Sequence, residues 1–186
     1  PIYAYRHPHI GYLPQGAPTS PMLSNLVMRG PDRKIATLAT KAGLTYTRYS
    51  DDITFSTTGV FDRAKAMAVV RETTAILRAT GLEVNGRKTR IVPPGARKVV
   101  LGLLVDGKVP QLTREFRDRV RQHLHYLETR GPEAHRAARN FDTVAGLYRH
   151  VRGLIDFANS VDAVFADRML TKFDAVRWSL DSPEGT

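Results

Sequence analysis

Two adjacent carboxylates, Asp51 and Asp52, are the residues of this sequence best suited to chemistry. Tyr49 precedes them, and β-branched or aromatic residues flank them on both sides, so we expect the pair at the tip of a hairpin. Like charges this close repel each other unless a cation lies between them. Mg²⁺ prefers hard oxygen ligands and usually takes one or two of them from protein carboxylates. The alternative is a solvated Asp-Asp turn without a ligand, which is the commoner role of an isolated pair.

The segments around this pair are predicted to be short strands and amphipathic helices. Strands are expected over residues 44–49, 53–57, 82–84, 90–92, 99–105 and 108–110. Helices are expected over residues 22–42, 62–80, 114–130, 139–158 and 161–178. Gly30-Pro31 is expected to kink the first helix or divide it in two, and Asp106-Gly107 is expected to form a hairpin turn. A mixed portion over residues 1–110 thus precedes a helical portion over residues 111–186, and the predicted fold class is α+β.

The charge of the chain indicates a polyanionic partner. Lys and Arg number 28 against 18 Asp and Glu, which gives a formal net charge of +10. The excess is +6 over residues 60–110 and +4 over residues 111–152, whereas residues 153–186 carry −3. Residues 111–152 contain arginine but no lysine, and guanidinium groups suit phosphate contacts, although arginine on helices is also common as solubilising charge. Nucleic acid is therefore the first candidate partner.

Other classes of protein are disfavoured by what the sequence lacks. It contains no cysteine, so it has no disulfide framework, no cysteine-ligated zinc and no thiol nucleophile. Its apolar runs are too short for a membrane span or a secretory signal. We expect a soluble, cytoplasmic protein with no membrane partner.

Three motifs follow one another in a specific order and spacing. They are Gly11-Tyr-Leu-Pro-Gln-Gly-Ala-Pro-Thr-Ser-Pro-Met-Leu-Ser-Asn-Leu26, Tyr46-Thr-Arg-Tyr-Ser-Asp-Asp-Ile-Thr-Phe-Ser56 and Gly81-Leu-Glu-Val-Asn-Gly-Arg-Lys-Thr89. Together they resemble the reverse transcriptases of bacteria, most of all the retron type, with group II intron enzymes as cousins. The resemblance covers roughly residues 11–175. It implies an RNA-directed DNA polymerase, a nucleotidyltransferase of the prokaryotic cytoplasm that uses an RNA template, an RNA/DNA duplex and deoxynucleoside triphosphates.

The resemblance implies a partial polymerase palm over residues 1–110, with the Tyr-x-Asp-Asp hairpin at its centre. Two Mg²⁺ ions then promote in-line phosphoryl transfer, with Asp51 as the principal ligand and Asp52 as a weaker one. Tyr49 would pack under the primer terminus. Gln15 and Gly16 would lie beneath the incoming nucleotide and the template, where glycine permits close approach of the backbone.

Further residues receive roles from the same resemblance. Lys88 would lie near the triphosphate and offer a cation or a proton to the leaving group. Leu101 and Gly102 would grip the primer end. The helices of residues 111–186 would form the thumb, with phosphate contacts expected from Arg114, Arg117 and Arg121.

The sequence departs from the family pattern in two ways that matter for activity. Ser50 occupies a position that is usually alanine, and we expect this small residue to be tolerated. A third aspartate is expected from a strand before the Pro-Gln-Gly loop, but residues 1–31 contain no Asp or Glu. Acids later in the chain, such as Asp62, Asp106 and Asp118, lie in the wrong topological place to replace it. We therefore expect the isolated chain to be inactive.

Three explanations fit these departures: a C-terminal fragment of a longer enzyme, one subunit of a split enzyme, or a domain retained for binding. The first residue is Pro1 rather than Met, which fits a piece of something longer. An unpaired palm edge would need a cover, so we expect an N-terminal half, a partner chain or a second copy of this chain. Besides the polymerase, two other functions remain open: a non-catalytic RNA-binding module of an antiviral defence or regulatory complex, and an untemplated polymerase of the same fold.

Overall fold

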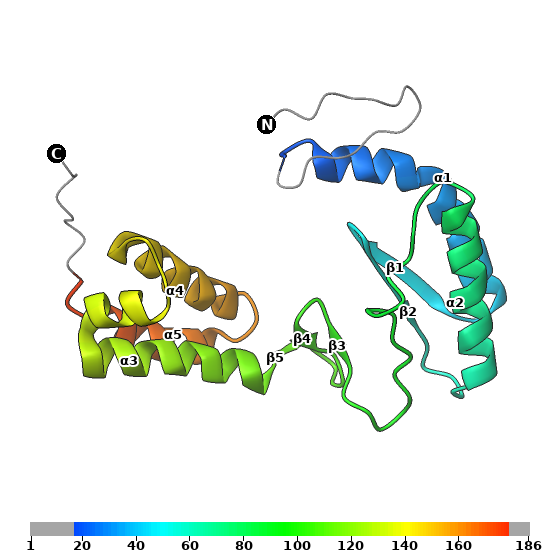
Figure 1. Cartoon of the computed structure of the whole chain (residues 1–186). Coiled ribbons are helices and arrows are strands. Elements are labelled where there is room, and N and C mark those ends of the chain that lie inside the picture. The colour runs from blue at the N-terminus through cyan, green and yellow to red at the C-terminus, as the bar shows by residue number, and fades with distance from the viewer. Residues whose placement is uncertain (1–16, 179–186) are drawn as a thin grey trace, which may run out of the picture. The chain divides into compact units, whose positions relative to one another are not determined.

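A computed structural model of the chain describes residues 17–178, which divide into two compact units (Figure 1). The first unit ends at Ala96 and the second begins at Arg97. Both combine helices with a small antiparallel sheet, so the predicted α+β class is confirmed. The division into a palm portion over residues 1–110 and a thumb portion over residues 111–186 is a functional one and stays a prediction. No helix between residues 17 and 178 has the length and apolar character needed to cross a membrane.

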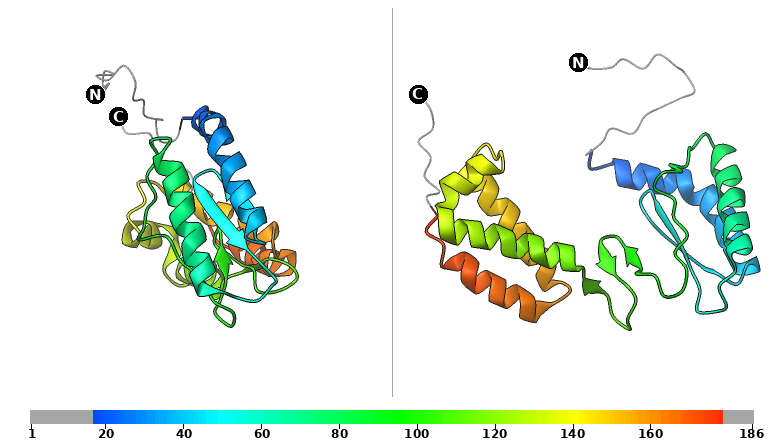
Figure 2. Two further views of the ribbon diagram at one scale, coloured as in Figure 1. Left: turned by 90° about the vertical axis from the view of Figure 1, so that its right-hand side faces the viewer. Right: turned by 60° about the horizontal axis from the view of Figure 1, so that its bottom comes forward.

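The first unit is built on the predicted hairpin. Strand β1 (Thr45–Tyr49) pairs antiparallel with β2 (Asp52–Ser56), in the register that places Tyr49 opposite Asp52. Helix α1 (Ser20–Lys41) precedes the hairpin and α2 (Arg63–Arg78) follows it, and the two helices lie side by side against it (Figure 2). The side chain of Asp62 caps α2 by accepting a hydrogen bond from the Lys65 amide at 3.1 Å.

One face of the hairpin is buried against both helices because its strands alternate. Inward positions of β1 and β2 pack on the buried side chains of Met28 and Ile35 from α1 and Leu77 from α2. The partly buried residues around this small core are Tyr46, Ile53, Phe55, Ile76, Leu82 and Val84. The other face of the hairpin therefore remains open.

Helix α1 is continuous through Pro31, so of the two predicted alternatives the division into two helices is wrong, whereas a bend along the helix is visible in Figure 1. Pro31 removes one backbone hydrogen bond, but its ring is buried, and the helix is anchored on both sides by Met28 and Ile35. Burial of this apolar stripe outweighs the local cost. Thr19 stands at the N-cap position, but its side chain makes no capping hydrogen bond.

The strands predicted over residues 82–84 and 90–92 are absent, and this stretch consists of turns and irregular backbone. Leu82 and Val84 do pack against the core of the first unit. Their alternating apolar pattern therefore reflects burial on the helices and not pairing in a ladder.

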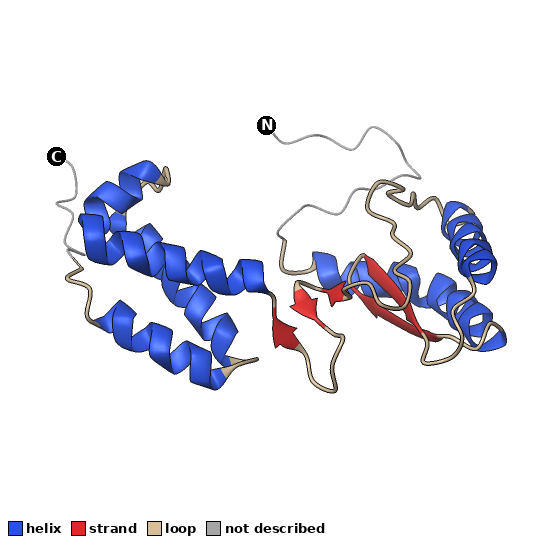
Figure 3. Cartoon of the chain, turned by 90° about the horizontal axis from the view of Figure 1, so that it is seen from below, coloured by secondary structure: helices blue, strands red, loops and turns tan. Residues whose placement is uncertain are grey.

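The second unit begins with a sheet of three very short strands (Figure 3). Strand β3 (Val99–Val100) pairs with β4 (Leu103–Leu104), and β4 pairs with β5 (Gln111–Leu112). The predicted strand over residues 99–105 is thus a tight hairpin, and the predicted strand over residues 108–110 is a loop. Leu103 and Leu112 pack on the helical core of this unit, which selects the register that brings β4 and β5 together.

Three helices make up the rest of the second unit: α3 (Arg114–Ala138), α4 (Val144–Asn159) and α5 (Ala163–Asp174). The side chains of Thr113, Thr143 and Asp162 cap their N-termini. The helix predicted over residues 114–130 does end in a break, because Gly131 adopts φ 77° and ψ 166°, but residues 132–138, which were not predicted as helix, continue α3 beyond it. The segment 139–143 was predicted as helix, but it forms the turn that precedes α4.

The core of the second unit lies between these three helices. Its fully buried members include Val120 from α3, Leu147 and Val151 from α4, and Phe173 from α5. Tyr148 and Trp178 pack on Phe173, with ring centroids 4.9 Å from the Phe173 ring in both cases. This apolar packing holds the helices together and leaves their arginine-rich faces to solvent.

Candidate functional site

The two carboxylates lie at the tip of the β1–β2 hairpin, as predicted. Ser50 and Asp51 form a two-residue turn, and Asp52 is the first residue of β2. Ser50 has φ 53°, in the left-handed region, whereas Asp51 does not. A positive φ at the first turn residue alone is the pattern of a type II′ turn, which suits a two-residue hairpin. Asp51 and Asp52 are both exposed.

Tyr49 lies on the open face of the hairpin. It alternates with the inward-facing Tyr46 and Arg48, and its side chain is 68% exposed. Its cross-strand partner is Asp52. The hairpin thus presents an aromatic ring and a carboxylate on one surface, where a ligand has access to both.

The residue pattern of the tip fits Mg²⁺ in part. Two exposed carboxylates match the number that a magnesium site usually takes from a protein. Among residues 17–178, no group of three or more histidine, cysteine or acidic residues is arranged to hold a metal ion. The described part of the chain therefore offers two carboxylate ligands at the tip and no third.

Sequence reasoning missed a polar network beneath the tip. Arg48 forms a fork with Asp32, from Nε to Oδ1 at 2.9 Å and from Nη2 to Oδ2 at 2.7 Å. The Tyr46 hydroxyl also donates to Asp32 Oδ1 at 2.6 Å. The hydrogen bond from Arg48 holds the pKa of Asp32 below its usual value, and burial together with the Asp32 carboxylate raises the pKa of Tyr46. One signal was visible in the sequence: Arg48 occupies an inward strand position that would ordinarily be apolar.

The other predicted nucleotide-binding residues are only partly described. Lys88 lies in an exposed turn of the first unit, where its amide donates to the Asn85 carbonyl at 3.1 Å. Gln15 and Gly16 lie outside the described residues. The roles of these three residues stay predictions.

The predicted primer-grip pair forms the tip of the β3–β4 hairpin in the second unit. Leu101 and Gly102 are the two turn residues, with φ 49° and φ 80°. Positive φ at both positions is the pattern of a type I′ turn, which tolerates glycine readily but strains leucine. The Leu101 side chain is 51% exposed, so an apolar group is offered at this tip.

The three arginines predicted to contact phosphate lie on α3 and already have partners within the protein. Arg117 pairs with Asp162 at 2.8 Å and so joins α3 to the start of α5. Arg114 and Arg121 both pair with Asp118, at 3.5 and 3.0 Å. These exposed pairs with Asp118 are weak enough to be exchanged for a phosphate.

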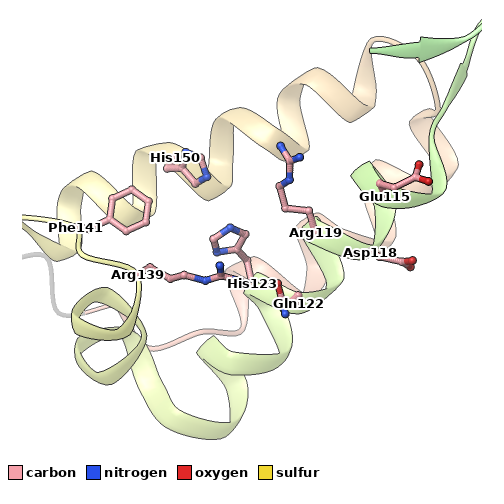
Figure 4. A pocket seen from close by; sticks show the side chains of 8 residues that line it. All are labelled: Glu115, Asp118, Arg119, Gln122, His123, Arg139, Phe141 and His150. Carbon is pink, nitrogen blue, oxygen red and sulfur yellow. Dashed lines mark hydrogen bonds between the residues drawn. The ribbon is translucent and has the colours of Figure 1, made fainter. Parts of the chain in front are cut away.

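A cavity of about 570 Å³ lies on α3, α4 and the turn between them (Figure 4), and none of these three arginines lines it. Basic, acidic and aromatic side chains line it, namely Glu115, Asp118, Arg119, Gln122, His123, Arg139, Phe141 and His150. At its base the buried His123 ring shares a hydrogen bond with His135, with Nδ1 and Nε2 2.9 Å apart. Its arginine and aromatic side chains are of the kinds that nucleotides contact, but two carboxylates, Glu115 and Asp118, belong to the same lining.

Lowering the pH is expected to destabilise the second unit through His123. Burial, and then the charges of His135, His150, Arg139 and Arg119, lower the pKa of His123 from 6.5 to about 4. Between those values the unfolded chain binds a proton that the folded chain does not, so the free energy of unfolding falls as the pH is lowered. Because solvent screens part of the charge, we expect a loss of roughly 1–2 kcal/mol across this window.

Denaturant unfolding of the chain at a series of pH values between 4 and 7 measures this effect. His123→Gln should remove much of the pH dependence. His125→Gln alters an exposed histidine on the same helix and should leave it unchanged. Equal slopes in wild type and His123→Gln would show that this ring does not couple folding to pH.

Known proteins resemble most of the chain. Residues 4–127 match the family described as reverse transcriptase (RNA-dependent DNA polymerase). The retron Mx65 reverse transcriptase of Myxococcus xanthus is 37% identical over 158 residues, which cover 83% of this chain and 33% of the relative. The retron Ec86 reverse transcriptase of Escherichia coli is 33% identical over 159 residues, which cover 86% of this chain and 45% of the relative.

These comparisons agree with the resemblance carried by the three motifs. The chain spans less than half the length of either relative. The matched family region contains the whole β1–β2 hairpin with Asp51 and Asp52. The chain therefore belongs to the reverse transcriptase (RNA-dependent DNA polymerase) family.

Proposed function

We propose that this chain carries the Tyr-x-Asp-Asp part of the active site of a retron-type RNA-directed DNA polymerase. The observation that carries the proposal is the β1–β2 hairpin, whose two-residue turn presents Asp51 and Asp52 at the tip, in a chain of the reverse transcriptase family. Both carboxylates are exposed and lie beside an open aromatic surface made by Tyr49.

In this proposal the tip holds Mg²⁺, which when bound activates the primer hydroxyl and neutralises charge on the leaving pyrophosphate. Asp51 would be the principal ligand and Asp52 the weaker one. Tyr49, on the open face, would pack under the primer terminus. Lys88, in its exposed turn, would offer a cation or a proton to the leaving group.

Residues 111–186 would act as the thumb and hold the nucleic-acid duplex. Leu101 and Gly102, at their hairpin tip, would contact the primer end. Phosphates would displace Asp118 from Arg114 and Arg121, while Arg117 would keep its structural pair with Asp162 unless the duplex approaches the start of α5. The net excess of basic residues over 60–152 supports this assignment.

The remaining carboxylate of a two-metal site would come from polypeptide outside these residues, either an N-terminal part of the same protein or a partner chain. The described residues supply only the two aspartates of the tip. A chain that spans a third to a half of its relatives is consistent with such an arrangement.

Primer extension tests the proposal. The complete gene product is incubated with an RNA template, a DNA primer and deoxynucleotides, with Mg²⁺ or with EDTA, and with the template omitted. We expect extension that requires both Mg²⁺ and the template. Extension without the template would indicate an untemplated polymerase of the same fold, and no extension under any condition would overturn the proposal.

The cavity with Arg119 and Arg139 favours one alternative, a non-catalytic RNA-binding module of a defence complex. Both functions predict RNA binding that weakens with salt. The logarithm of the association constant should fall linearly with the logarithm of the salt concentration, with a slope of about −0.7 to −0.9 per phosphate contact. The binding module would keep its biological activity when Asp51 is replaced, whereas the polymerase would lose it. A flat salt response would argue against both.

A further inference from the structure

Arg48 is unusual because its charged group faces the interior of the first unit. Its side chain is only 11% exposed, and it projects from the β1 face that otherwise packs on the helices. Removing a guanidinium from water is costly unless its donors are satisfied. Here they are satisfied by three different residues, which lie on two separate elements.

Two of these partners belong to α1. Asp32 accepts the fork from Nε and Nη2, and Asn25 Oδ1 accepts from Nη1 at 2.9 Å. Asn25 and Asp32 are seven residues apart, so they lie on one face of the helix about two turns apart. Tyr46 donates to the same carboxylate, so Asp32 receives hydrogen bonds from two inward residues of β1. Helix α1 is itself anchored by Met28 and Ile35 and provides a firm base.

The third partner is the backbone of the hairpin tip. Arg48 Nη1 also donates to the Ser50 carbonyl at 2.6 Å. This carbonyl belongs to the peptide that joins Ser50 to Asp51, so the contact restricts the rotation of that peptide. Ser50 already holds a left-handed φ of 53°, which a serine does not favour and which therefore needs support from its surroundings.

We propose that Arg48 is a positioning residue for the catalytic tip: by linking the Ser50 carbonyl to Asp32 and Asn25 on α1, it fixes the backbone from which Asp51 and Asp52 present their carboxylates to the metal. The inference rests on the proposed function. Arg48 touches neither substrate nor metal in this scheme. It acts through the tip, because a displacement of about 1 Å in a catalytic group can cost as much as 10²-fold in rate.

Lysine in place of Arg48 tests the proposal, since it keeps the charge but cannot form the fork and reach Ser50 at the same time. In the complete gene product, we expect Arg48→Lys to lower kcat for primer extension by about 10- to 100-fold with KM for the deoxynucleotide changed less than about threefold. Mn²⁺ binding is measured by electron paramagnetic resonance of the free ion, and the sites at the tip are those whose binding is lost in Asp51→Asn. We expect Arg48→Lys to bind Mn²⁺ more weakly at these sites than wild type.

Two further variants keep the result interpretable. Arg97→Lys alters a similar fork, in which Arg97 binds both oxygens of Glu115 at 2.8 and 2.9 Å, but it lies in the second unit, away from the tip in sequence. It should leave kcat and Mn²⁺ binding unchanged. Circular dichroism establishes that each variant is folded. If Arg48→Lys does not fold, Asp32→Asn replaces it in the test, because asparagine weakens the hydrogen bonds that Arg48 makes to residue 32 but has nearly the shape of aspartate.

The outcomes separate this inference from the proposed function. If the wild-type protein extends no primer, or if Asp51→Asn extends as well as wild type, the proposed function itself fails. If wild type extends the primer and Asp51→Asn does not, but folded Arg48→Lys (or Asp32→Asn in its place) keeps kcat and Mn²⁺ affinity within twofold of wild type, only the positioning role of Arg48 is overturned. Equal losses in Arg97→Lys would likewise overturn it, because the effect would not be specific to the tip.

Discussion

Replacement of Asp51 by Asn is expected to lower the rate of nucleotide incorporation by the complete gene product at least about 10³-fold, because in the proposed function Asp51 carries the principal charge that holds the metal. Asparagine has nearly the same shape as aspartate and suits a hairpin turn, so the β1–β2 fold should persist. The loss would then reflect charge and not structure. Asp52→Asn should have the smaller effect of the two. Single-turnover primer extension at saturating deoxynucleotide measures both rates.

Asp62→Asn is the matched control for this substitution. Asp62 caps α2 in the same unit, and asparagine is an equally good N-cap residue, so stability and activity should both be kept. Activity of Asp51→Asn within tenfold of wild type would contradict the assignment of Asp51 as the principal ligand. It would favour the RNA-binding module instead.

Truncation of Phe173 to alanine is expected to lower the free energy of unfolding of the second unit by about 3–5 kcal/mol. Phe173 is 1% exposed and lies in the core between α3, α4 and α5. Its ring contacts Tyr148 and Trp178, and its backbone carbonyl accepts a hydrogen bond from Trp178 Nε1 at 3.2 Å. Alanine would leave a cavity that these large rings could fill only in part.

Trp178 provides the measurement, because it is the only tryptophan of the chain and packs directly on Phe173. Its fluorescence during denaturant unfolding reports on the second unit alone. Val164→Ala changes a side chain of the same helix that is 64% exposed, and its effect should stay within about 0.5 kcal/mol. Similar destabilisation by the two substitutions would argue against the packing of Phe173.

The hairpin tip was predictable because everything that forms it is local. Its strands, its two-residue turn and its acids lie within twelve consecutive residues, and alternation of side chains already separates Tyr46 from Tyr49. The break at Gly131 was predictable for the same reason, since a Gly-Pro pair carries its conformational preference with it. The family followed from motifs of this local kind.

Long-range packing decided the features that the sequence left open or indicated wrongly. Asp106-Gly107 does lie in a hairpin connection, the loop over residues 105–110 between β4 and β5. The tight two-residue turn nevertheless forms at Leu101-Gly102, because this register lets Leu103 and Leu112 reach the core of the second unit. Pro31 stays within α1 because burial on both sides of it outweighs one missing hydrogen bond.

By itself, then, the sequence determined the hairpin tip and the residues at it, since the types, order and spacing of Tyr49, Asp51 and Asp52 need no distant contact to be recognised. Only the tertiary structure decided what lies beneath the tip. Asp32 and Arg48 are sixteen residues apart, and no local pattern pairs an acid on a helix with an arginine on a following strand. They meet because the apolar faces of α1 and the hairpin pack together. The fold thereby places the hydrogen bonds of Arg48 to Asp32 and to the Ser50 carbonyl beneath the tip that carries Asp51 and Asp52.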